Sequence, residues 1–177
     1  MNRSPRRRPI HHPRTPPPSG APPSPKILEA IGEEGVFEMI ADFYGVLEQS
    51  TIRDLFPLDM HTASRRSAAF FVQILGGRPL YSQHFGPPRM RQKHEPYEID
   101  SYARAAWLAC FDVVLEVAEE RYGFPPEHLP EFRAFLESFS AWMVNAEDEP
   151  GSASPAAQDR PEQHQPDRER GHESEEA

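Results

Sequence analysis

A short basic segment in the middle of the chain holds the residues best suited to chemistry. His94 lies between Arg91 and Lys93, and Pro96 follows two residues later. Because this proline prevents a long helix from carrying the histidine inward, His94 is a poor candidate for core packing. A neutral imidazole binds metal, and flanking cations favour the neutral form. His94 is therefore a candidate metal ligand beside an anionic cofactor, although a solvated surface histidine fits the same pattern.

The residues around His94 belong to a folded body between two tails. Residues 1–25 hold nine prolines and five arginines without an acidic or aromatic residue, and residues 147–177 hold ten acidic residues against three arginines. Neither tail can bury enough apolar surface to offset the entropy of ordering, so we predict that both are disordered. Residues 26–146 carry every Phe, Tyr and Trp and are long enough for a single domain with a sizeable core.

Charge and hydropathy exclude several classes of partner. The net charges are +5 for the first tail and −7 each for the body and the last tail, and an acidic body argues against nucleic acid. The basic arm could touch anionic lipid, nucleic acid or the acidic tail, or could simply be solvated. No apolar run approaches the roughly 20 residues of a membrane span, and no signal-peptide pattern is present. We therefore expect no membrane partner and a cytoplasmic location.

Hydrophobic periodicity predicts the helices that must position His94. Apolar side chains repeat at helical spacing over residues 33–47 and 60–75, where Arg65 and Arg66 are expected to point outward. A third helix, over residues 100–122, is apolar on nearly all sides and is expected to be the central, most buried one. Two prolines start the last helix, over residues 125–145.

The connection that leads to His94 is unusually long. Gly76 and Gly77 end the second helix, and a loop of about fifteen residues follows. A compact domain rarely keeps a structureless connection of this length unless the connection has a function. No stretch alternates apolar and polar residues between turn signals, so the sequence predicts an all-α fold. The single cysteine, Cys110, rules out an internal disulfide and a cysteine-based zinc site, and on the buried third helix it should be inert.

The order and spacing of several motifs resemble those of the group II truncated haemoglobins. The motifs are Phe43-Tyr44, Gly-Gly-Arg-Pro-Leu-Tyr at 76–81, the basic run ending in His-Glu-Pro-Tyr at 94–97, and Ala-Trp-Leu-Ala-Cys at 106–110. The resemblance covers about residues 28–145. It implies a truncated globin fold, a two-over-two helical sandwich in which two helical pairs clasp haem b (iron protoporphyrin IX). It also implies that His94 is the proximal iron ligand.

The resemblance implies roles for the residues around such a haem. Tyr44 and Trp107 would be the distal hydrogen-bond donors. The rest of the implied haem site is Phe56, Ala63 and Ser67 on the distal side, Phe70, Phe71 and Phe111 against the porphyrin, Tyr97 beside the proximal histidine, and Arg91 and Lys93 near the propionates. From the residues alone, Tyr44 and Trp107 fit a hydrophobic core equally well, the phenylalanines are equally typical of plain core, and Arg91 and Lys93 fit a solvated surface.

Several positions depart from the family pattern. Pro87 stands where the family usually has the histidine of Gly-His-Pro, Leu75 stands where a tryptophan is common, and Arg78 interrupts Gly-Gly-Pro. Lys93 replaces the frequent arginine before the proximal histidine. Ser67 occupies a distal position that is normally apolar, and this departure bears on the distal hydrogen bonds more than on haem binding. The two further candidates for a sixth ligand are His61 and His84.

The resemblance implies a haem protein that reversibly binds O₂ and other diatomic gases such as NO and CO. NO dioxygenase or peroxidase-like activity would need electrons, and the sequence carries no flavin- or nicotinamide-binding fingerprint, so catalysis implies an external reductase. A haem-based gas or redox sensor that signals through its tails is a second hypothesis. A haem-free globin-fold interaction module is a third, although it would have no use for His94, Tyr44 and Trp107 together. A monomer and a homodimer both remain open.

Overall fold

The computed structural model of the chain describes residues 17–18 and 20–148, and the predicted disorder of the tails lies mostly outside these residues. Every regular element in the described part is a helix, which confirms the all-α prediction there. The elements are α1 (Pro25–Glu48), η1 (Arg53–Leu55), α2 (Met60–Ile74), α3 (Leu80–Phe85), α4 (Met90–His94), α5 (Ser101–Leu115), α6 (Ala118–Tyr122), η2 (Pro126–His128) and α7 (Leu129–Met143). None of these helices is long and apolar enough to cross a membrane.

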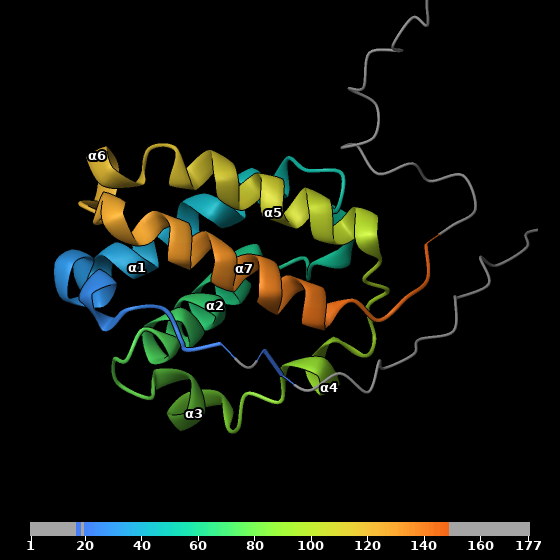
Figure 1. Cartoon of the computed structure of the whole chain (residues 1–177). Helices are drawn as coiled ribbons and strands as arrows, with labels where there is room; N and C mark the ends of the chain where they lie inside the picture. Colours follow the sequence, from blue (N-terminus) through green and yellow to red (C-terminus); the bar gives the residue numbers. More distant parts are fainter. Residues whose placement is uncertain (1–16, 19, 149–177) are drawn as a thin grey trace, which may run out of the picture.

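The four long helices form two packed pairs. Helices α1 and α2 pack on each other, and α5 and α7 lie side by side in front of them (Figure 1). Phe43 of α1 stacks on Phe111 of α5 with ring centroids 3.7 Å apart, and Phe71 of α2 lies 5.7 Å from Phe111. Phe132 of α7 completes this aromatic core, 6.0 Å from Phe71. The expected two-over-two helical sandwich is confirmed.

Helix α1 begins earlier than the periodicity indicates. The Ser24 side chain accepts a hydrogen bond from the Lys26 amide at 3.3 Å, and Pro25 occupies the first turn, as is typical of helix starts. Gly32 then has a φ of +70°, a left-handed conformation that kinks the helix. The helix predicted from residue 33 corresponds to the straight segment of α1 after this kink. Because the kink turns the helix, the residues before it do not share the same stripe.

The third predicted helix is two helices, and it is not buried on all sides. Helix α5 ends at Leu115 and α6 begins at Ala118, so the continuous helix predicted to residue 122 was wrong. Val113 and Val117 are 51% and 46% exposed, contrary to the expectation that this would be the most buried helix. Helix α1 has more buried residues than α5. A run of apolar letters does not show which face a neighbouring helix covers, and here one face of α5 is left uncovered.

The long connection before His94 is not structureless. It forms the short helices α3 and α4, which lie along one edge of the molecule (Figure 1). The Ser82 amide donates to Gln73 Oε1 at 2.9 Å, and Tyr81 is only 2% exposed, so tertiary contacts hold α3. Gly86, with a φ of +74°, separates the two helices. Helices of five or six residues are too short to show a 3.6-residue period, which is why the sequence did not reveal them.

The last predicted helix is also shorter than expected. A 3-10 turn, η2, takes up its first residues, and α7 ends at Met143 instead of residue 145. Val144 leaves the helical conformation, with a ψ of 127°, and directs the following residues back toward the segment after His94. Both the Asn145 and Ala146 amides donate to the Ile99 carbonyl, at 2.9 and 3.1 Å. The residues just after α7 are therefore packed beside α4 and the start of α5.

Gly77 makes a close contact that we expect to be sensitive to substitution. A Cβ at this position would lie 2.6 Å from Leu28 Cδ2 and 2.9 Å from the Val72 carbonyl oxygen. Gly77→Ala should therefore destabilise the protein by about 1–3 kcal/mol, as overpacking commonly does. Gly45, on an exposed face of α1, would place a Cβ in open space, so Gly45→Ala should stabilise by about 0.5–1 kcal/mol. Urea unfolding of both variants, followed by circular dichroism, tests the contrast, and equal stabilities would contradict it.

Candidate functional site

One cavity lies between the two helical pairs and the edge formed by α3 and α4. Its volume is about 270 Å³, and its walls come from α1, η1, α2, α3, α4, α5 and α7. Most of the side chains that line it are aromatic or aliphatic. A pocket of this character holds a largely apolar ligand and orients it through a few polar groups.

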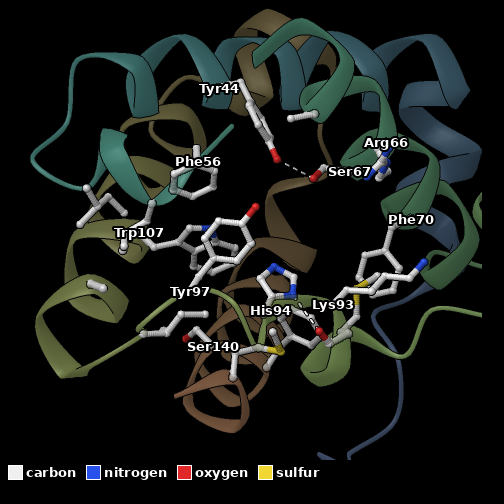
Figure 2. A pocket seen from close by; sticks show the side chains of 18 of the residues that line it. Tyr44, Phe56, Arg66, Ser67, Phe70, Lys93, His94, Tyr97, Trp107 and Ser140 are labelled. Carbon is white, nitrogen blue, oxygen red and sulfur yellow. Dashed lines mark hydrogen bonds between the residues drawn. The ribbon is translucent and has the colours of Figure 1, made fainter. Parts of the chain in front are cut away.

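His94, the last residue of α4, is the histidine that lines this cavity. Its Nδ1 lies 2.7 Å from the Met90 carbonyl oxygen, one helical turn earlier. Because a carbonyl only accepts, Nδ1 carries the proton in this bond, and the other ring nitrogen faces the cavity without one in the neutral form (Figure 2). Burial lowers the pKa of His94, and the hydrogen bond to Met90 partly opposes this shift. The imidazole is therefore neutral at pH 7 and able to coordinate a metal.

Tyr44 and Ser67 stand on the opposite side of the cavity from His94 (Figure 2). Tyr44 comes from α1, is 8% exposed, and its hydroxyl lies 2.8 Å from Ser67 Oγ on α2. Phe56 packs edge-on against the Tyr44 ring, with centroids 6.0 Å apart. Burial raises the pKa of Tyr44, so the phenol keeps its proton at neutral pH and remains a possible donor.

Trp107 and Phe111 are one turn apart on α5, but they have different surroundings. Trp107 lines the cavity, and its ring lies 4.6 Å from the Phe111 ring, centroid to centroid. Phe111 is 0% exposed, does not line the cavity, and stacks on Phe43 behind it. The resemblance implies that Phe111 contacts the cofactor, whereas the structure places it in the aromatic core.

The two cations beside His94 contact different neighbours. Lys93 lines the cavity, and its Nζ donates to the Tyr81 hydroxyl at 2.9 Å and to the Phe85 carbonyl at 3.1 Å. Arg91 does not line the cavity. Its Nε donates to the Trp142 carbonyl at 2.7 Å, and its guanidinium lies 4.6 Å from the centre of the Trp142 ring. Arg91 thus joins α4 to α7, whereas Lys93 joins α4 to α3.

Most of the residues singled out from the sequence come together at this cavity. Ten of the twelve implied cofactor residues line it: Tyr44, Phe56, Ala63, Ser67, Phe70, Phe71, Lys93, His94, Tyr97 and Trp107. The exceptions are Arg91 and Phe111. His61 and His84 are exposed and do not line the cavity, and Cys110 is buried, where burial raises the pKa of its thiol.

Several wall residues were not foreseen. Arg66, expected to point outward, is exposed but also reaches the rim of the cavity, with its guanidinium 5.0 Å from the centre of the Phe85 ring. Arg104 lines the cavity from α5 and donates to Ser140 Oγ at 3.2 Å. Tyr81 belongs to the Gly-Gly…Tyr motif, a signal that could have identified it as a site residue. No local signal marked the two arginines, since their distance from the cavity depends on how α2 and α5 pack.

The helical body that forms this cavity matches a known class of protein. Residues 26–145 match the family profile of the bacterial-like globins, and the chain therefore belongs to that family.

Within this class the resemblance to the group II truncated haemoglobins is confirmed. The chain is 37% identical over 83 residues to a group 2 truncated haemoglobin of Bacillus subtilis, a match that covers 46% of this chain and 63% of that relative, less than two thirds of its length. The phosphate-bound Hell's gate globin IV has 36% identity and a TM-score of 0.68, covering 75% of this chain and 82% of that one. The truncated oxygen-avid haemoglobin from Bacillus subtilis has 32% identity and a TM-score of 0.61. That match covers 69% of this chain and 99% of that one.

Proposed function

We propose that this protein binds haem b through His94 and uses it to bind O₂ and other diatomic gases such as NO and CO reversibly. The observation that supports the proposal most directly is the state of His94. Its Nδ1 is occupied by the Met90 carbonyl at 2.7 Å, which leaves the second ring nitrogen available in an apolar cavity. The family membership and the similarity to an oxygen-avid truncated haemoglobin point the same way.

The residues of the cavity fit a haem. Phe56, Phe70 and Phe71 supply apolar surface for a porphyrin, and a neutral imidazole suits its iron. Arg66 and Lys93, on the cavity wall, suit two carboxylates of an otherwise apolar ligand. When bound through one imidazole, the haem supplies an iron with an open sixth position for a small ligand.

The chain's own residues would select and hold that ligand on the side of Tyr44. The outer atom of O₂ at such a site has partial negative charge, so a protonated hydroxyl aimed at it stabilises binding. If the Tyr44 hydroxyl donates to the gas, its oxygen is left to accept from Ser67, 2.8 Å away. Ser67 would then hold Tyr44 in the donating orientation. The Trp107 indole N–H is the second donor that we propose on this wall.

Ser67→Ala tests this arrangement of hydroxyls. Loss of one neutral hydrogen bond is worth about 0.5–1.5 kcal/mol, so we expect O₂ to dissociate roughly two to ten times faster. Stopped-flow measurement of O₂ release from the haem-loaded protein gives the rate. Ser64→Ala, a buried serine of the same helix that does not line the cavity, is the matched control. Slower release in Ser67→Ala would show instead that Ser67 competes with the gas for the Tyr44 proton.

An absorption spectrum tests the proposed function as a whole. The full chain, loaded with haem, should show a strong Soret band that shifts on reduction with dithionite and again on exposure to CO or O₂. A chain that remains colourless when haem is added would overturn the proposal and favour a haem-free interaction module.

Redox turnover is a further possibility for the same site. NO dioxygenation and peroxidase-like reactions both consume electrons, which an external reductase would have to deliver. No particular contact in the described cavity favours either reaction over reversible gas binding. Gas binding is therefore the function that we propose, and oxidation of NO by the O₂-loaded protein would be the observation that extends it to catalysis.

A further inference from the structure

The segment from His94 to Ile99 has no regular structure after α4 and is held by one buried side chain. Asn145 is 3% exposed, and its Nδ2 donates to the Tyr97 carbonyl at 3.0 Å and to the His94 carbonyl at 3.3 Å. Its Oδ1 accepts from the Ile99 amide at 2.8 Å. One carboxamide thus contacts the backbone at the beginning, the middle and the end of this segment.

Asparagine suits this position because the segment offers both donors and acceptors. Buried backbone groups without a partner cost free energy, and a carboxamide can donate twice and accept at the same time. Alanine could do neither, and aspartate could only accept. The backbone of the same region adds to the contact, since the Asn145 amide donates to the Ile99 carbonyl at 2.9 Å.

A second contact joins α4 to the end of α7 on the other side of His94. Arg91 lies three residues before the histidine, and its Nε donates to the Trp142 carbonyl at 2.7 Å. Its guanidinium also lies over the Trp142 ring, 4.6 Å from the centre. We call Arg91, Trp142 and Asn145 the proximal clamp. The clamp fixes α4 on both sides of the residue that faces the cavity.

We propose that Asn145 is a positioning residue for His94. The His94 ring is bonded to Met90 within the same helix, so the ring's place in the cavity depends on where α4 lies. A helix of five residues is not stable by itself, and outside contacts must set its position. Asn145 does so from the segment just after α7, 51 residues along the chain from His94. This inference rests on the proposed function, because the consequence of a displaced His94 is a weaker and altered bond to iron.

Two Asn145 variants and one control test the proposal in the haem-loaded full chain. Asn145→Ala removes every side-chain contact to the segment. Asn145→Asp keeps the acceptor for the Ile99 amide but loses the donor to the His94 and Tyr97 carbonyls. Arg133→Gln is the control, because it breaks an ion pair between α7 and Asp112 of α5 without touching the segment. Circular dichroism and melting curves establish that each variant is folded.

Three measurements report on His94 and on the segment that follows it. These are the iron–histidine stretching band of the dithionite-reduced protein by resonance Raman, the rate of haem transfer to apomyoglobin, and the hydrogen exchange of the Ile99 amide. We expect a shifted or broadened band in both Asn145 variants and haem loss at least about tenfold faster, as for other residues that orient a metal ligand. Exchange at Ile99 should rise in Asn145→Ala. The control should keep the wild-type band and rate.

The outcomes separate this inference from the function on which it rests. A wild-type chain without a Soret band would overturn both. A wild-type chain that binds haem, together with Asn145 variants that keep its Raman band and its rate of haem loss, would overturn the role of Asn145 alone. If Asn145→Ala does not fold, the Raman band and the rate of haem loss of Asn145→Asp decide the question. A band that shifts equally in Arg133→Gln would also contradict the proposal, since the effect would then come from general loosening of α7.

Discussion

His94→Gly is expected to lose haem at least about 100 times faster than the wild-type protein. Residues that merely orient a metal ligand commonly change affinity by about 10- to 100-fold, and removal of the ligand itself should cost more. Within the part of the chain that the structure describes, His94 is the only histidine that lines the cavity, so no other described imidazole is placed to replace it there. Haem transfer to apomyoglobin, followed at the Soret band, measures the rate.

Imidazole in the buffer should partly restore haem binding to His94→Gly. The substitution removes the ring but leaves its space, and free imidazole can occupy it as a ligand. His84→Ala is the control, because His84 is exposed on α3 and does not line the cavity. A His94→Gly protein that retains haem like the wild type would mean that the iron is held elsewhere. Loss of haem in His84→Ala would point to that residue.

Tyr44→Phe is expected to release O₂ about ten times faster or more. A hydrogen bond to a group with negative charge is worth about 1.5–3 kcal/mol, which corresponds to roughly a 10- to 150-fold change in the rate. The substitution removes only the hydroxyl group. The ring can keep its contacts with Phe43 and Phe56, so the fold should be preserved. Stopped-flow measurements of O₂ and CO release from the haem-loaded protein test this expectation. CO release should change much less, because CO has little charge on its outer atom.

Tyr102→Phe provides the matched control for Tyr44→Phe. It also removes one tyrosine hydroxyl, here bonded to Thr51 Oγ1 at 2.8 Å, but Tyr102 does not line the cavity. Its O₂ release rate should equal that of the wild type. If Tyr44→Phe also leaves the rate unchanged, the hydroxyl does not donate to the gas, and Trp107 becomes the remaining donor. An equal acceleration of O₂ and CO release would indicate a change in the shape of the cavity rather than a lost hydrogen bond.

The long helices could be predicted from the sequence because each has a continuous apolar stripe. Residues 33–47 and 60–75 agree closely with the straight part of α1 and with α2. The short helices α3 and α4 could not be foreseen, since five or six residues show no period and are held by contacts such as Ser82 to Gln73. The break between α5 and α6 could not be foreseen either. The residues between the two helices, Glu116 and Val117, include no glycine or proline, so the sequence carries no breaker signal there.

The candidate site was predictable to the extent that its residues form motifs. His94, Tyr44 and Trp107 were named from their order and spacing, and all three line the cavity. Phe70 and Phe111 could not be distinguished from the sequence. Phe70 lines the cavity, whereas Phe111 is fully buried behind it. Helical periodicity shows that two residues share a face, but the neighbouring helices determine whether that face meets a cavity or a core.

The helical class and the extent of the aromatic body could be predicted from composition and local periodicity. Residue type and neighbours made His94 a candidate metal ligand, and its assignment to iron came from the family resemblance. The tertiary structure alone decided that Arg91 contacts Trp142 rather than the cavity, and that Asn145 holds the segment after His94. These contacts join residues about fifty positions apart, and no local pattern specifies such pairs. They follow from the packing of α4 against the end of α7, which brings a donor to each of these part-buried carbonyls.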